Sequence, residues 1–111
     1  MKNEKNLNYQ IIENVRNIMK LLIKIELNQN INNIIQKNNI LYDNLINEIK
    51  YELGIIKQFD HFKNVKFENM INFKTLNNNQ ELNLFVKKIE ELLKIILKLL
   101  INQLKLIFKK N

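Results

Sequence analysis

Residues 64–80, NVKFENMINFKTLNNNQ, interrupt a chain whose remaining length has the apolar spacing of helices. Apolar and polar residues alternate in this stretch, and the alternating apolar residues are Val65, Phe67, Ile71 and Phe73. A period of two is typical of a β-strand with one buried face. The stretch therefore predicts a β-hairpin over residues 64–76. Because a two-stranded hairpin is only marginally stable alone, its edges would need further strands to pair with.

The segment before this stretch has the spacing of a long amphipathic helix. Apolar residues follow one another at intervals of four and three over residues 11–25 and again, in a shifted register, over residues 31–56. This spacing is the seam of a coiled coil. We expect one helical arm over residues 5–58 with a local defect where the polar residues 28–30 interrupt the seam. A true break at that point is the alternative.

The segment after the stretch predicts a second helical arm over residues 79–110. Asn78 and Glu81 have the spacing of a capping box, which begins a helix. Two apolar stripes, starting at Leu82 and Val86, adjoin and cover roughly two-thirds of the helix circumference. One antiparallel helix covers a single stripe. The second stripe needs another cover, which we expect to be a neighbouring chain, a membrane or another apolar partner.

The composition excludes several kinds of chemistry. The chain has no Cys, Ser, Ala, Pro or Trp, and Asn, Lys, Ile and Leu fill most positions, as expected from an AT-rich organellar, endosymbiont or parasite genome. Without cysteine there is no disulfide or thiolate metal site. The single histidine, His61, follows Asp60 in a connecting segment, and Thr75 is the only hydroxyl residue besides tyrosine. We therefore expect no enzymatic activity, no metal and no cofactor.

The net charge of +7 leaves two alternatives open besides codon bias. Lysines on the polar side of the second arm could follow phosphates, as in an RNA-associated or ribosome-associated protein. The same helix could lie on an acidic membrane surface as part of an assembly factor. We expect no specific nucleic-acid partner, because arginine is almost missing. We expect no signal peptide and no membrane span, because lysines interrupt the most apolar run.

The order of helix, short hairpin and helix resembles a β-type prefoldin subunit. The residue match is best over residues 47–79. NEIKYELGII resembles the end of the family's first arm, VKFENMINF resembles its hairpin, and NNNQEL resembles the entry to the second arm. The ending NQLKLIF is similar to the subunit-four branch of the family.

This resemblance implies a mostly α fold, with two long antiparallel coiled-coil helices joined by a short β-hairpin in a single domain over residues 1–111. It implies a cytoplasmic, ATP-independent chaperone subunit whose partners are other prefoldin-like subunits in a hetero-hexamer, unfolded polypeptides and a chaperonin. The hairpin residues Val65, Phe67, Ile71 and Phe73 would join the subunits. Clients would bind at the helix tips, formed by Leu7, Tyr9, Ile11, Leu104, Leu106, Ile107 and Phe108.

Overall fold

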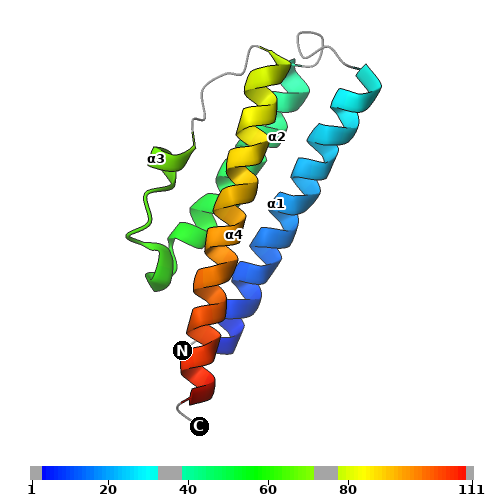
Figure 1. The fold of residues 1–111 in the computed structure, drawn as a ribbon. Coiled ribbons are helices and arrows are strands. Elements are labelled where there is room, and N and C mark those ends of the chain that lie inside the picture. Colours follow the sequence, from blue (N-terminus) through cyan, green and yellow to red (C-terminus); the bar gives the residue numbers. More distant parts are fainter. Residues whose placement is uncertain (1–3, 33–38, 72–77, 110–111) are drawn as a thin grey trace.

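The first half of the chain folds into two antiparallel helices that lie side by side (Figure 1). The computed structural model describes residues 4–32, 39–71 and 78–109. Helix α1 is Glu4–Asn32 and helix α2 is Asn39–Lys57. The prediction of one continuous helix over residues 5–58 is therefore wrong. A single helix of that length would extend about 80 Å, whereas the longest dimension of the molecule is 54 Å.

The polar residues 28–30 do not break α1, although they interrupt its apolar seam. The Asn28 side-chain amide donates a hydrogen bond to the Lys24 carbonyl at 2.8 Å, within the helix. The Gln29 amide donates to the side-chain oxygen of Asn83, in the first turns of α4, at 3.0 Å. The polar residues thus mark the end of the buried seam and pair the end of α1 with the beginning of α4.

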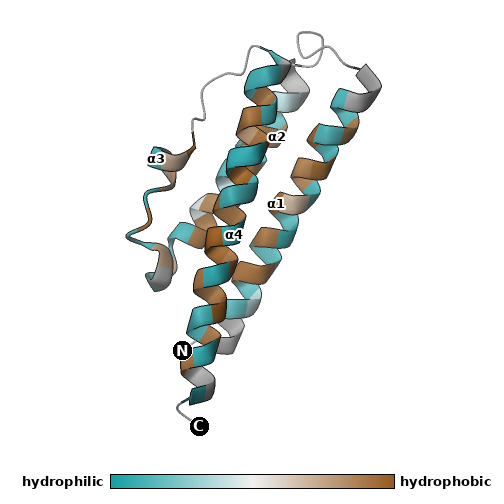
Figure 2. Ribbon diagram, viewed as in Figure 1, coloured by the Kyte–Doolittle hydropathy of each residue, from teal (hydrophilic) through white to brown (hydrophobic). Residues whose placement is uncertain are grey.

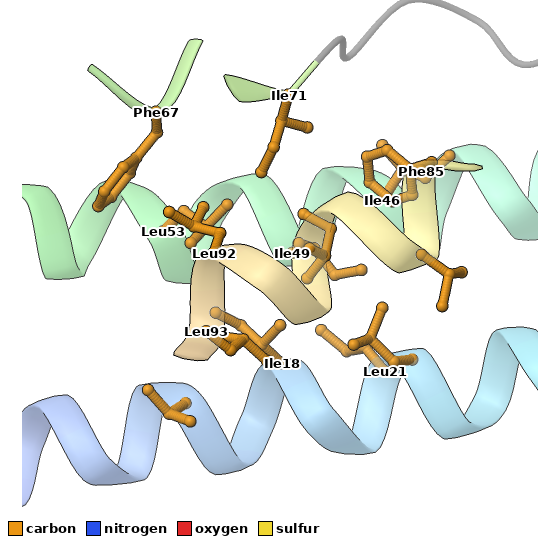
Figure 3. Close-up of a cluster of buried hydrophobic side chains, with 14 of the residues drawn as sticks. Ile18, Leu21, Ile46, Ile49, Leu53, Phe67, Ile71, Phe85, Leu92 and Leu93 are labelled. Carbon is orange, nitrogen blue, oxygen red and sulfur yellow. The ribbon is translucent and has the colours of Figure 1, made fainter. Parts of the chain in front are cut away.

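Helix α4 (Asn79–Lys109) lies against both α1 and α2. The predicted cap is present, since the Asn78 side-chain oxygen accepts a hydrogen bond from the Glu81 backbone N–H at 2.8 Å. Figure 3 shows Phe85 and Leu92 of α4 on the side of α2, and Leu93 on the side of α1. The two apolar stripes of α4 therefore have separate partners, and both partners come from the same chain.

One hydrophobic core joins the three long helices, and the structure confirms the predicted mostly α fold. The seam of α1 is buried as expected, through Ile11, Val15, Ile18, Leu22 and Ile25. The seam of α2 is buried through Tyr42, Leu45, Ile49 and Ile56. Burial raises the pKa of the Tyr42 hydroxyl above its ordinary value, because the charged form would lose its hydration.

A polar contact lies between α1 and α2. It is formed at Glu52, a carboxylate residue at a seam position of α2. The Glu52 carboxylate accepts hydrogen bonds from the side-chain amides of Asn14, at 2.6 Å, and Asn17, at 3.3 Å. Asn14 also accepts a hydrogen bond from Gln10 at 3.2 Å. Because Asn14 is buried, these bonds replace the water that it loses on folding. The contact fixes which turn of α1 lies beside Glu52.

The region predicted as a hairpin is helical and turn-like where it is described. After α2 the chain passes through η2 (Asp60–Phe62) and α3 (Phe67–Met70), and residues 4–32, 39–71 and 78–109 contain no strand. The backbone N–H of Ile71 donates to the Phe67 carbonyl at 3.1 Å, a bond of one helical turn. The structure therefore does not support the hairpin over residues 64–76. Its second strand, with Phe73, lies outside the described residues.

We predict that Ile96→Ala lowers the free energy of unfolding by about 2–5 kcal/mol, because Ile96 is completely buried and its loss leaves a cavity. The neighbouring Ile95→Ala is the matched control, since Ile95 is 39% exposed and should cost under about 1 kcal/mol. Urea denaturation measures both values. Equal losses in the two variants would contradict the position of α4 over α1 and α2.

We predict that Gly54→Ala raises the thermal unfolding midpoint. Gly54 is exposed within α2, and a Cβ atom at this position would meet no atom within 4 Å. Alanine is favoured over glycine inside a helix by about 0.5–1 kcal/mol. Circular dichroism during heating measures the change, and a lower midpoint would contradict an unobstructed helical position here.

Candidate binding surface

The described residues among those expected to join subunits, Val65, Phe67 and Ile71, pack into the protein's own core. Phe67 and Ile71 are buried and point toward Leu53 and Leu92 (Figure 3). Val65 is half-buried and packs against the same core. These side chains hold η2 and α3 against the bundle and form no exposed edge for a neighbouring subunit.

The residues expected at the helix tips lie at one end of the bundle, where α1 begins and α4 ends (Figure 1). Tyr9 is 70% exposed and Leu106 is 54% exposed, while Leu104 is half-buried. Ile11 is completely buried, so it belongs to the core and does not face a client in this structure. The side chains of the remaining predicted tip residues lie outside the described part of the chain; these residues are Leu7, Ile107 and Phe108.

Helix α4 continues beyond the core at this end. The last buried residue of α4 is Leu100, among the side chains that are described, yet the helix runs to Lys109. Figure 1 shows that α4 and the start of α1 extend past the end of α2 at Lys57. Beyond the end of α2, the apolar side chains of α4 are therefore covered by α1 alone. We call this surface the open end, and it consists of Tyr9, Leu99, Ile101, Leu104 and Leu106.

The open end is strongly basic. From Lys94 to the end of the chain there are five lysines and no acidic residue, whereas the whole chain has 18 basic and 11 acidic residues. Four of these lysines have described side chains, and all four are exposed: Lys94, Lys98, Lys105 and Lys109. Figure 2 shows hydrophilic and hydrophobic residues alternating along this end of α4. The surface therefore combines apolar contact area with a positive field.

A buried side-chain amide without a partner lies at the same end. Asn8 is 5% exposed, and its side-chain nitrogen has no hydrogen-bond partner. An unsatisfied buried donor costs about 1–3 kcal/mol. Because this nitrogen is itself buried, it is not within reach of a bound molecule.

The other polar features of the described residues are structural. Lys63 pairs with Asp60 at 2.9 Å, and Lys88 with Glu91 at 3.9 Å, each pair three residues apart. The described part of the chain has no group of three carboxylate or histidine residues that could hold a metal ion. A shallow groove between α1 and α2 carries charges of both signs, from Lys20, Lys24, Glu48 and Glu52. None of these arrangements joins a nucleophile to a base.

No helix within the described ranges combines the length and the apolar character that crossing a bilayer requires. Comparisons with models of protein families, with curated proteins and with solved structures gave no match.

Sequence reasoning missed two residues of this surface, Leu99 and Ile101. Leu99 has the spacing of a core stripe, and its 37% exposure follows only from where α2 ends. The run of lysines without acids after Lys94 is the sequence signal that marks this end as different from the rest of α4.

We predict that Phe67→Ala destabilises the folded chain by about 3 kcal/mol, because Phe67 is buried against α2 and α4. Tyr51→Ala serves as control, since Tyr51 is an exposed aromatic residue of α2. Chemical denaturation and sedimentation are measured on both. An unchanged stability together with dissociation of an oligomer would restore the hairpin interpretation.

Proposed function

We propose that this chain is a non-catalytic, ATP-independent holding protein that binds apolar segments of unfolded polypeptides at the open end. The observation that carries the proposal is that α4 keeps its amphipathic pattern for nine residues beyond Leu100, the last buried residue described on it. Exposed leucine and isoleucine on a rigid helix provide contact area without a fixed complementary shape. Such a surface suits a partner that is itself irregular.

The expected strength of binding is low. Complete burial of one leucine is worth about 1.5–3 kcal/mol. Because Leu99, Ile101 and Leu106 are 37–54% exposed, about half of that gain remains for each of them. The sum, roughly 3–4 kcal/mol, corresponds to millimolar or weaker affinity at one surface. Weak contacts of this kind release the client readily, and several molecules on one unfolded chain would hold it by avidity.

One further feature favours polypeptide as the partner. The exposed Lys98, Lys105 and Lys109 favour segments with acidic residues beside the apolar ones. The proposal keeps the holding activity implied by the resemblance to prefoldin. It leaves out the hairpin-built hetero-hexamer and transfer to a chaperonin, because Phe67 and Ile71 are core residues.

The test is suppression of client aggregation, measured by light scattering when an unfolded protein is diluted from denaturant with the full chain present. We expect the wild-type chain to suppress aggregation. We expect Leu106→Gln to weaken the apparent affinity about five-fold, because about 1 kcal/mol of apolar burial is lost. The matched control is Leu84→Gln, a change of the same residue type in the first turns of α4, where Leu84 is 57% exposed.

Equal effects of Leu106→Gln and Leu84→Gln would overturn the proposal, as would a wild-type chain that leaves aggregation unchanged. The alternatives are measured on the same variants with acidic phospholipid vesicles and with RNA. Binding to vesicles without suppression of aggregation would replace the proposal with a membrane-associated role. Binding to RNA that falls steeply with salt would replace it with an RNA-associated role.

A further inference from the structure

A second surface, separate from the open end, lies where α1 and α4 meet. An apolar groove of about 340 Å³ runs between the two helices, and its apolar lining is Met19, Leu22, Ile23, Leu93 and Leu97. Met19 and Ile23 are about half exposed, although they lie beside the core. These two residues lie on the flank of α1 that faces α4, opposite the flank that carries Asn14 and Asn17 toward Glu52.

The charged residues at this groove are arranged in a self-complementary way. Glu90 and Lys94 both line it and lie four residues apart on α4, on either side of Leu93 in sequence. Neither has an ion-pair partner among the described residues. The third charged lining residue, Glu26, lies on α1 and is exposed. Opposite charges spaced by one helical turn face each other when a second copy is placed in the opposite direction.

We propose that the groove is the dimerisation surface for a second copy of this chain, related by a two-fold axis perpendicular to the helices. In this arrangement α4 lies antiparallel to α4 of the second copy, and α1 antiparallel to α1. Glu90 of each copy lies against Lys94 of the other, and Met19 lies against Ile23. A two-fold interface uses the same surface twice, so each of these contacts occurs two times.

A second copy fits this groove better than an unrelated helix does. The groove carries both signs of charge in one turn, so a partner with a uniformly acidic or basic face would leave a like-charge contact. Both helices supply the apolar lining, α1 with Met19, Leu22 and Ile23 and α4 with Leu93 and Leu97. A copy of the same surface supplies the matching charges and the matching apolar residues at the same spacing.

The dimer leaves much of the open end free. Leu99 and Leu106 are seven residues apart and share one face of α4, on the opposite flank from Leu97, which lines the groove. Leu99 and Leu106 therefore stay available to a client in the dimer, whereas Ile101, four residues after Leu97, shares the flank of the groove. The inference does not rest on the proposed function, and either can fail without the other.

The test is the mass of the full chain in solution, measured by analytical ultracentrifugation over a range of concentrations. We expect a concentration-dependent dimer for the wild type. Ile23→Lys should raise the dissociation constant at least about ten-fold, because it places two lysines in the apolar part of the interface. Leu84→Lys is the control, since Leu84 is equally exposed but lies outside the groove, and it should change the constant less than about two-fold.

Charge exchange separates this arrangement from other dimers. Glu90→Lys should weaken the dimer about five-fold, because each new lysine lies against Lys94 of the other copy. The double variant Glu90→Lys with Lys94→Glu reverses both charges and should restore the wild-type constant within about two-fold. Circular dichroism confirms that each variant is folded. A wild-type chain that is monomeric at every concentration would overturn the proposal, as would a dimer insensitive to Ile23→Lys or a double variant that fails to recover.

Discussion

The breadth of the apolar face on α4 is the constraint on which the rest of the structure depends. Two adjoining stripes over the first two-thirds of this helix must be removed from water, and one antiparallel helix can cover only one of them. The chain meets this requirement by folding its first half into α1 and α2, which contact different stripes. Neither helix is expected to be stable alone, since helices in proteins gain most of their stability from tertiary packing. The three-helix bundle is therefore the smallest arrangement in which every stripe has a partner.

The lengths of the helices then determine how far along α4 the three-helix packing extends. Helix α2 has 19 residues and α4 has 31, so α4 extends about 18 Å further than α2 can cover. At one end the hydrogen bond between Gln29 and Asn83 joins α1 to α4 through polar groups. At the other end, the apolar residues and lysines of α4 are not covered by α2. The two ends of the bundle thus have different surfaces, although the same amphipathic pattern runs through α4, and the candidate binding surface arises from this difference in length.

Local sequence patterns predicted the parts of the fold that depend on neighbouring residues. The buried seam of residues 11–25 and the cap formed by Asn78 follow from spacing alone, and both are present. The separation of α1 from α2 could not be predicted, because neither Pro nor Gly stands between them and the apolar spacing is helical on both sides. The hairpin was predicted because alternation and a single helical turn both place Phe67 and Ile71 on one face. Whether this segment forms a strand or a helical turn is decided only by its contact with α2 and α4. Exposure at Leu99 and Ile101 also depends on a distant helix end, which no local pattern contains.

The chain begins α1 and ends α4 at the same pole of the molecule, beside the open end (Figure 1). A peptide extension, affinity tag or reporter group joined to either terminus starts within reach of Leu104 and Leu106. Short flexible tethers give effective concentrations in the millimolar range, comparable with the weak affinity expected at one surface. An apolar or acidic extension would therefore occupy the surface from within the same polypeptide. Attachments that leave the surface accessible belong at the opposite pole, near the first turn of α4.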